Sequence, residues 1–487
     1  MDAIEQFLVD GYLEVRPTNL SPSDHQALYA SAAGVYRRAG VSPGETDHLD
    51  VFGDRALLRE IPDCQKILDD PAVVAALTTI LGDRYFVHPH CFLHKATQLD
   101  QVFHQDGNLP WNERGHYRTH RADWALLFYY PQAVTLENGP TEIVPGSQYW
   151  TKDFEKEEGG WHPGDAFDRK FRTEVMESED LALRDRRNQA ALDSLGIPGL
   201  TRKFVTGPAG QVLICNYDLV HRGARQLPGQ NERFMYKFYF ARTQAPESTG
   251  DPLQIEPPRP ELAPVVDYCQ AWQLGLAQKP RPASTWDIRN DREDERLAMA
   301  YDLAARQQFS PLLAALVDDR EAVRRAAAYG LRALDAEHAE AILPLTRHER
   351  PSTRRLANFA LGNAANAVYP SIVSNLSEAI EREGDDLARS NAAYSLGQVG
   401  RGRLSDAKQT FDTILARLEP GIEPDNTRVA GLPRSTVRQS LAYAALQIAS
   451  NHPLALSRQV TLLTEDCDRY VAGFFKEIKH RLTLAGR

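Results

Sequence analysis

Cysteine is scarce in this chain. Its 487 residues include five cysteines, and no two of them form a CxxC or other closely spaced pair. They are Cys64, Cys91, Cys215, Cys269 and Cys467. This scatter argues against a disulfide framework and against a cysteine-based zinc site. It is typical of the reduced thiols of a cytoplasmic protein.

Long apolar runs and an excess of positive charge are also missing. No apolar run approaches the ~20 residues that a membrane helix needs. The N-terminus, MDAIEQFLVDGY, has no basic region ahead of an apolar stretch, so no signal peptide is expected. The formal net charge is −10, which disfavours non-specific binding to nucleic acid. We therefore expect a cytoplasmic protein with neither a membrane nor a nucleic acid as partner.

The acidic excess lies in one half of the chain. Residues 291–487 carry 26 basic and 26 acidic side chains, which leaves 30 basic and 40 acidic side chains in residues 1–290. Many prolines stand between the halves, in EPPRPELAP and QKPRP, and proline blocks helix interiors and central strands. The sequence thus predicts a domain over 1–245, a linker or wrapping segment over 246–290, and a second domain over 291–487.

The second domain repeats itself. Five segments share an arginine at the second position and an aromatic at the seventh, and four of them have leucine at the ninth. They are ERLAMAYDLAAR (295–306), VRRAAAYGLRAL (323–334), TRRLANFALGNA (353–364), ARSNAAYSLGQV (388–399) and VRQSLAYAALQI (437–448). Such periods with apolar residues at helical spacing indicate stacked helices that bury one common core. The segment resembles HEAT-type repeats, which implies an all-α solenoid.

Two roles for these repeats stay open. They either pack on the first domain, stabilising it or making a dimer contact, or they offer a concave surface to a protein partner or a large substrate. No catalytic cluster occurs in this half of the sequence.

The first domain is rich in strand patterns. RYFVHPHCFLHKA, WALLFYYP, QVLICNYDLVH and FMYKFYFART are dense in aromatic and branched residues, which favours strands. Helical pattern is mostly confined to the first 80 residues or so. An antiparallel double-sheet barrel, or jelly roll, with flanking helices fits this order.

One set of polar residues falls at strand positions. His104-Gln105-Asp106 follows the apolar Val102-Phe103, His221 ends the run VLICNYDLVH, and Arg233 opens the run RFMYKFYF. Two imidazoles and one carboxylate occupy one face of an iron(II) ion and leave three positions open. Arginine pairs in two-pronged fashion with an organic carboxylate. A second triplet, His48-Leu49-Asp50, has no strand before it and is interpreted as surface or lid.

At these residues the sequence resembles the phytanoyl-CoA dioxygenase-like family of iron(II)/2-oxoglutarate oxygenases. FLVDGYLEV, HQDG (104–107), ENGPTEIVPGSQ (137–148) and VLICNYDLVHRGARQ carry the resemblance, which spans about residues 1–245. It implies a double-stranded β-helix of cupin type. It also implies Fe(II), 2-oxoglutarate and O₂ as cofactor and co-substrates, with iron ligands His104, Asp106 and His221. Arg233 then matches the 2-oxoglutarate arginine, and Asn138-Gly139 matches a tight turn.

Two positions depart from the family pattern. Gly223 stands where a serine or threonine often contacts the co-substrate, and Gln148 replaces a histidine. Lys95 or Gln101 is expected to supply the lost co-substrate contact. Asp106 bears on the type of reaction, because related halogenases have a small residue at this position. Its presence favours hydroxylation, desaturation or ring formation over halogenation.

The segments around the motif suggest substrate contacts. Trp111 is near enough to line the pocket. Arg118 lies in a basic stretch with Arg114, His116, His120 and Arg121, which is either a solvated loop or a grip on a substrate carboxylate or phosphate. Arg225, after the second histidine, is expected to join that grip, together with Arg222. The polar stretch 150–203 is interpreted as a lid.

The sequence therefore predicts an oxygenase that hydroxylates an unactivated C–H bond of a small, anionic metabolite or natural-product intermediate. The alternative is a non-catalytic binding or scaffold protein with a retained oxygenase fold and a partner-binding repeat domain. A third alternative is a metal-binding barrel with another co-substrate.

Overall fold

The computed structural model describes most of the chain in two compact units. One unit comprises residues 1–106, 122–152 and 163–242, and the other comprises 107–121, 153–162 and 243–487. Residues that the structure does not describe are 1, 41–47, 50–55, 102, 107–119, 151–179, 194–200, 248–250, 282–284, 334–335, 363–369, 403, 405–406, 419–427, 430–431, 434–435, 453–457, 467 and 486–487.

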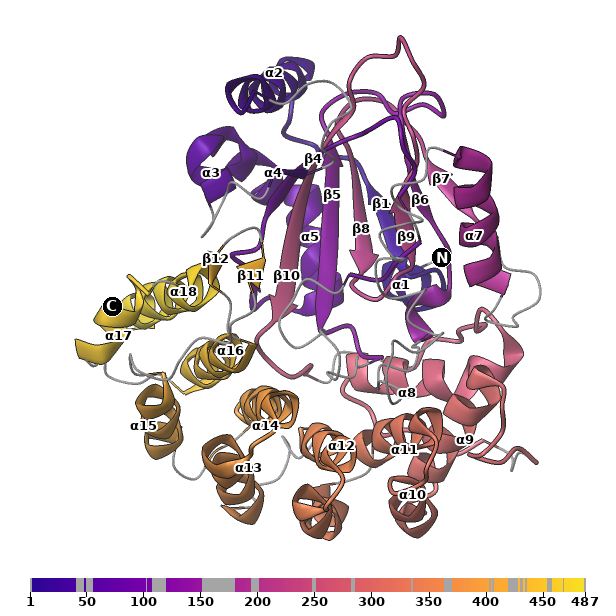
Figure 1. Ribbon diagram of the computed structural model, residues 1–487, viewed down its shortest axis with the longest axis vertical. Helices are drawn as coiled ribbons and strands as arrows, with labels where there is room; N and C mark the ends of the chain where they lie inside the picture. Colours follow the sequence, from indigo (N-terminus) through magenta and orange to yellow (C-terminus); the bar gives the residue numbers. More distant parts are fainter. Residues whose placement is uncertain are drawn as a thin grey trace. The chain divides into compact units, whose positions relative to one another are not determined.

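The first unit is built on two antiparallel sheets (Figure 1). The larger sheet has the order β1 (Tyr12–Val15), β8 (Gln211–Asn216), β5 (Trp124–Tyr130), β10 (Phe234–Arg242), β4 (Phe92–Lys95) and β2 (His48–Leu49), and β3 (Tyr85–Val87) also pairs with β10. The smaller sheet has the order β7 (Lys203–Val205), β6 (Thr141–Ile143) and β9 (His221–Gly223). This matches the expected double-sheet oxygenase core.

Helices cover one face of the larger sheet. They include α1 (Ala3–Val9), α2 (Pro22–Arg38), α3 (Ala56–Glu60), α4 (Gln65–Leu68) and α5 (Pro71–Leu81). Along β10, Phe234, Tyr236, Phe238 and Phe240 enter the core beneath these helices. Side chains alternate along a strand, so the residues between them face the opposite side of the sheet. The central strand is thus buried on both faces, and its second face is available for a site.

Two segments of this unit contain elements that the sequence did not predict. His48 and Leu49 are not in a loop but form the short strand β2, paired with His94 and Leu93 of β4. The polar stretch 150–203 contains the helix α7 (Leu181–Asp193). Outside α7, only Trp150, Asp180 and residues 201–203 of that stretch are described, so the lid interpretation stays a prediction.

The second unit is a layer of helices. It contains α8 (Ala263–Gln273), α9 (Glu293–Ala305), α10 (Phe309–Ala315), α11 (Glu321–Ala333), a 3₁₀ helix (Ala336–Arg347), α12 (Pro351–Leu361), α13 (Pro370–Arg382), α14 (Asp386–Val399), α15 (Ala407–Arg417), α16 (Thr436–Asn451), α17 (Arg458–Leu463) and α18 (Arg469–Ala485), with the short pair β11 (Arg428–Val429) and β12 (Leu432–Pro433). The first nine residues of each repeated segment lie on one helix: α9, α11, α12, α14 or α16. These helices pack in sequence order, as Figure 1 shows.

The repeated arginines have a shared structural use. Arg324 donates from Nη1 to the carbonyl oxygens of Asp318 and Asp319, at 2.7 Å each. Arg354 makes the equivalent bonds to His348 and Glu349, at 2.9 and 2.8 Å. Arg296, Arg389 and Arg438 each also bind a carbonyl earlier in the chain. Each arginine therefore satisfies backbone acceptors ahead of its own helix, which explains why the residue recurs.

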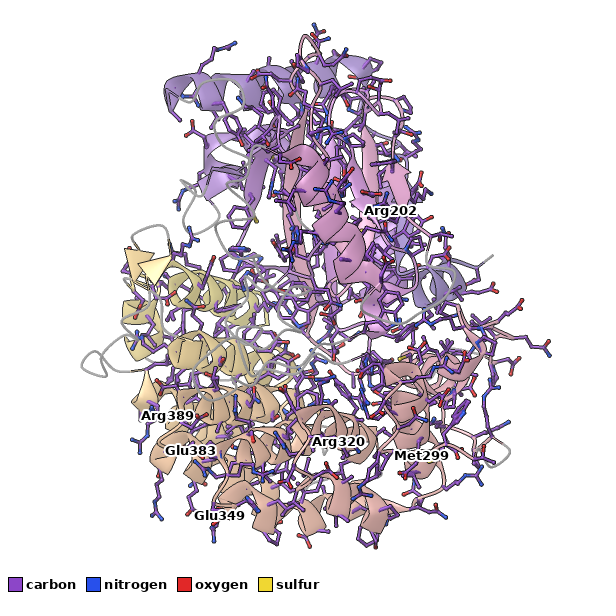
Figure 2. The ribbon with its side chains drawn as sticks, turned by 45° about the vertical axis from the view of Figure 1, so that its right-hand side comes forward. Arg202, Met299, Arg320, Glu349, Glu383 and Arg389 are labelled. Carbon is purple, nitrogen blue, oxygen red and sulfur yellow. The ribbon has the colours of Figure 1, made fainter. Side chains whose placement is uncertain are left out.

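Ion pairs support the same helices. Arg354 forms a two-pronged pair with Glu383, at 2.7 and 2.9 Å, and Arg389 pairs with Asp386 at 3.2 Å. Glu383 and Arg389 are labelled in Figure 2. Glu293 accepts from both Arg296 and Arg325, which joins α9 to α11. Burial raises the pKa of Glu293, but the two guanidinium groups outweigh it and hold the pKa below its usual range.

The repeated aromatics take part in ring pairs within the helical layer. The ring centroids of Tyr268 and Tyr301 are 4.7 Å apart, and those of Tyr329 and Phe359 are 5.8 Å apart. Further along, Tyr394 stacks on Tyr443 at 5.3 Å. The predicted linker contributes to this layer, because α8 carries Tyr268 and lies inside residues 246–290. Among the described residues, no helix is long and apolar enough to cross a membrane.

Candidate metal centre and co-substrate site

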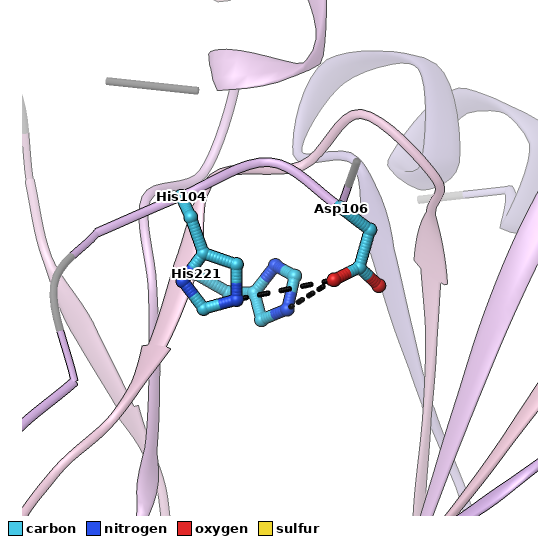
Figure 3. Close-up of side chains that lie close together, drawn as sticks. All are labelled: His104, Asp106 and His221. Carbon is cyan, nitrogen blue, oxygen red and sulfur yellow. Dashed lines mark ion pairs between the residues drawn. The ribbon is translucent and has the colours of Figure 1, made fainter. Parts of the chain in front are cut away.

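The two predicted histidine ligands are brought together by the backbone. His104 and His221 exchange two hydrogen bonds between their main chains, each 3.0 Å long. Their ring centroids are 4.6 Å apart as a result. Asp106 follows two residues after His104. The ligand atoms of the three side chains all lie within 4.8 Å of one another. Figure 3 shows the three side chains together.

His221 is held ready to act as a ligand. Its Nδ1 lies 2.9 Å from the carbonyl oxygen of Leu219, so Nδ1 carries the proton and Nε2 keeps its lone pair. Burial, with a smaller contribution from His104, lowers the pKa of His221 to about 3. The imidazole is therefore neutral at physiological pH, which is the form that binds metal ions.

The two oxygens of Asp106 have different surroundings. Oδ1 faces the histidines, 3.9 Å from His104 Nε2 and 3.8 Å from His221 Nε2. Oδ2 accepts from Lys237 Nζ at 2.6 Å and from Tyr239 Oη at 3.1 Å. Burial would raise the pKa of Asp106, but the positive charge of Lys237 outweighs it and holds the pKa well below its usual range. The carboxylate is ionised, and its Oδ1 faces the histidines.

This donor set fits iron(II). Two imidazole nitrogens and one carboxylate oxygen converge from one side, which is the arrangement that leaves several coordination positions open. Asp106 is 2% exposed and His221 is 5% exposed, so water has little access to these two side chains.

Arg233 is buried immediately before β10. Its Nε donates to the carbonyl oxygen of Gly139 at 2.7 Å. Gly139 has a φ of +86°, and an added Cβ would come within 2.7 Å of the Ala96 side chain. Asn138 fixes this turn through its side chain, with bonds to the backbone of Ala133 and Thr135. The Asn-Gly turn predicted from the sequence thus serves to hold Arg233 in place.

Gln101 lies over Gly223. The Gln101 carboxamide oxygen accepts from the backbone N–H of Gly223 at 2.8 Å. An added Cβ at Gly223 would meet that oxygen at 2.9 Å. The space of a larger side chain at position 223 is therefore already taken by Gln101.

Lys95 is not brought to the other predicted residues. It shares a face of β4 with Leu93, which is part of the core beneath the helices. Its Nζ pairs with Glu232 at 3.1 Å and lies 5.3 Å from the centre of the Tyr36 ring.

The predicted basic grip does not assemble among the described residues. Arg225 pairs with Asp100 at 2.9 Å, and Arg222 pairs with Glu142 at 2.6 Å. Trp111 and Arg118 lie outside the described residues. Gln148, the other departure from the family pattern, donates to the carbonyl oxygen of Leu8 at 3.0 Å and so supports the end of α1.

The interpretation of His120 and Arg121 as part of a solvated loop or a substrate grip is wrong. Both are buried and belong to the helical unit. His120 Nδ1 lies 2.7 Å from Tyr301 Oη, and Arg121 donates from Nε to Tyr268 Oη at 2.6 Å. Their charge and aromatic contacts are used for packing.

Lys237 and Tyr239 were not among the site residues predicted from the sequence. A signal was present, since Lys237 is the one charged residue inside FMYKFYF, a strand predicted to be buried. A lysine in that position is almost never fully buried without a partner. The strand pattern therefore implied an acidic group beside β10, and that group is Asp106.

A comparison with family models decides the assignment of the first unit. Residues 7–233 match the model of phytanoyl-CoA dioxygenase (PhyH). The N-terminal part of this chain is similar to the phytanoyl-CoA dioxygenase family. The match begins in α1 and ends at Arg233, so it includes all three residues of the metal cluster. This family of oxygenases uses iron(II), 2-oxoglutarate and O₂, which confirms the cofactor and co-substrates that the sequence predicted.

Solved structures of low identity were also found. One is the non-heme alpha-ketoglutarate-dependent epimerase SnoN from nogalamycin biosynthesis, at 16% identity and a TM-score of 0.34, covering 53% of this chain and 93% of SnoN. Another is HygX from Streptomyces hygroscopicus with nickel and 2-oxoglutarate bound, at 16% identity and a TM-score of 0.32, covering 49% of this chain and 84% of HygX. No curated protein matches the chain in sequence.

Proposed function

We propose that this protein is an iron(II)- and 2-oxoglutarate-dependent hydroxylase that acts on an unactivated C–H bond of a small metabolite or natural-product intermediate. The observation that carries the proposal is the convergence of His104, Asp106 and His221 within 4.8 Å, in a chain whose residues 7–233 match a dioxygenase family. An oxygenase fold that had become a scaffold would have no need to keep all three donors.

Each residue of the site has a proposed task. His104, Asp106 and His221 hold the iron, and Arg233 binds the far carboxylate of 2-oxoglutarate. Gln101 provides the contact that a serine or threonine at position 223 would otherwise make, because its carboxamide fills that space. When bound, iron with 2-oxoglutarate and O₂ supplies the oxidising chemistry, while the protein orients the substrate and excludes water.

Hydroxylation is proposed in preference to halogenation. A halide needs the coordination position that Asp106 Oδ1 is placed to fill. Asp106 is buried, ionised and bound by two donors, so it is a firm part of the donor set.

The substrate is proposed to be anionic, but fewer basic residues support this than the sequence suggested. Arg225, His120 and Arg121 each have partners within the protein. The proposal of an anionic substrate therefore depends on Arg118, and Trp111 is proposed to line the same pocket. A cytoplasmic location is proposed because the described cysteines, Cys64, Cys91, Cys215 and Cys269, form no disulfide.

The helical unit is proposed to be a HEAT-type solenoid. Support comes from five repeated helices that pack in order and whose arginines bind preceding carbonyls. A protein partner or a dimer contact through these repeats is also proposed. Light scattering of the purified chain across a range of concentrations tests the dimer contact. If the chain dimerises, the measured mass is twice that of one chain.

The test of function measures succinate formed from 2-oxoglutarate under air with iron(II), with a metabolite library searched for a product heavier by one oxygen atom. We expect succinate from the wild-type protein and none from His104→Ala or Asp106→Ala. His25→Gln is the matched control, because His25 lies in the same unit but binds Tyr129. Full succinate production by His104→Ala would contradict the proposal.

A further inference from the structure

Lys237 is an unusual residue for the centre of a sheet. It lies on β10, paired with Phe92 of β4 on one side and Phe128 of β5 on the other. Its side chain is 4% exposed. Burying a charged amine is costly unless a partner of opposite charge is close. An apolar residue would fit the surrounding aromatic strand, so the lysine must serve something other than packing.

The partner of Lys237 is the metal-facing carboxylate. Nζ lies 2.6 Å from Asp106 Oδ2, the oxygen that points away from the histidines. Tyr239, two residues along the same strand and on the same face, donates to that oxygen from 3.1 Å. Both donors thus come from one rigid strand and act on one atom.

The amine is itself fixed in place. Nζ lies 5.1 Å from the centre of the Phe128 ring and 5.3 Å from that of Tyr239, and both are within cation–π range. The Phe128 ring is also 5.5 Å from the His221 ring. The aromatic residues therefore hold the amine on Oδ2 and pack against a histidine of the cluster.

We propose that Lys237, assisted by Tyr239, is a positioning residue that restricts Asp106 to binding metal through Oδ1 alone. The inference rests on the proposed metal site. A carboxylate with both oxygens free is able to bind a metal with one or both of them. Lys237 and Tyr239 both bind Oδ2, so Oδ1 is the oxygen that is directed at the histidines. Loss of such a partner of a metal ligand typically weakens metal affinity about 10–100-fold.

The test uses cobalt(II) as a spectroscopic probe in the full chain, without 2-oxoglutarate, so that no turnover is involved. Lys237→Met keeps the length and packing of the side chain and removes the charge. We expect Co(II) to bind it about 10–100-fold more weakly than the wild type, with changed visible d–d bands because Oδ2 reaches the metal. Tyr239→Phe should show the same spectral change to a smaller degree. Lys237→Arg should restore the wild-type bands and most of the affinity.

Lys95→Met is the matched control. Lys95 is as buried as Lys237 and lies on the neighbouring strand, but its amine pairs with Glu232 on the face beneath the helices. We expect its Co(II) affinity and spectrum to match those of the wild type. A general loss from removing a buried lysine would appear in both variants.

Three outcomes would overturn the proposal. One is that Lys237→Met binds Co(II) with wild-type affinity and an unchanged spectrum. Another is that Lys237→Met binds Co(II) more tightly than the wild type, which would mean that the Lys237 charge repels the metal ion. Should Lys237→Met fail to fold, Tyr239→Phe decides, and an unchanged Co(II) spectrum there overturns the proposal as well. Failure of the proposed function is distinct, because it appears as absent metal binding or absent succinate in the wild type.

Discussion

His120 Nδ1 lies 2.7 Å from Tyr301 Oη, across 181 residues of sequence. The His120 ring is also 4.4 Å from the Tyr329 ring, so it is inserted between the aromatic residues of two successive repeats. His120 precedes β5, in the segment that follows the metal motif. The helical unit is therefore completed by residues that come from within the oxygenase part of the sequence.

A double-mutant cycle tests the importance of this contact. Tyr301→Phe removes the hydroxyl partner of His120, and His120→Ala removes the ring. We expect a coupling energy of about 1 kcal/mol between the two changes, since a buried hydrogen bond contributes about that much. Urea unfolding followed by the far-ultraviolet helix signal measures it. Strictly additive losses would mean that the two groups do not depend on each other.

Truncation of the chain near residue 285 should be damaging. It removes Tyr301 and Tyr329, the residues that enclose the buried His120. It also leaves α8 without α9, on which it packs. We expect a fragment that aggregates or unfolds at a lower temperature than the full chain, as size-exclusion chromatography and thermal melting would show. A soluble, monodisperse fragment with full activity would contradict this expectation.

Arg233→Ala should weaken the apparent affinity for 2-oxoglutarate. Losing a buried charged partner of a carboxylate costs about 2–5 kcal/mol, which corresponds to roughly 30-fold or more. The dependence of the succinate rate on 2-oxoglutarate concentration measures it. Arg225→Ala is the comparison, because Arg225 already pairs with Asp100. If Arg225→Ala shows the large loss and Arg233→Ala does not, the carboxylate is bound elsewhere.

The ion pairs of Glu293 should give the helical unit a particular response to acid. Arg325 and Arg296 hold the pKa of Glu293 below its usual value. This contribution to the free energy of unfolding is fully present above the unfolded pKa of about 4.3 and is lost as the pH falls through the lower folded pKa. At pH 7, Glu293→Gln should lower the free energy of unfolding by about 2 kcal/mol.

The difference between Glu293→Gln and the wild type should shrink as the solution is made more acidic than pH 4. Urea unfolding at several pH values provides the measurement. A difference that stays constant down to pH 3 would show that the charge of Glu293 does not support the helices.

The parts of the fold that were predictable depend on local patterns. The five repeated segments each became a helix, because their apolar spacing is helical over a single segment. The metal residues were predictable because His104 and His221 each stand at a strand position in a motif of known spacing. The resemblance to the phytanoyl-CoA dioxygenase family supplied the rest.

The parts that were not predictable depend on partners far away in sequence. Lys95 was expected at the co-substrate, but the residues FLHK do not reveal which face of β4 the helices cover. Arg121 looked like a solvated charge because Tyr268, its partner, is 147 residues away. For Lys237, the strand pattern indicated an acidic partner but not which one, since Asp106 lies on another segment.

One iron site is proposed to be formed by His104, Asp106 and His221. Its most direct test is an anaerobic titration of the metal-free protein with iron(II), followed by 2-oxoglutarate. We predict one tightly bound iron per chain and, on adding 2-oxoglutarate, the weak visible charge-transfer band of the chelate. Both should be lost in His221→Ala. Tight iron binding and the same band in His221→Ala would contradict the assignment.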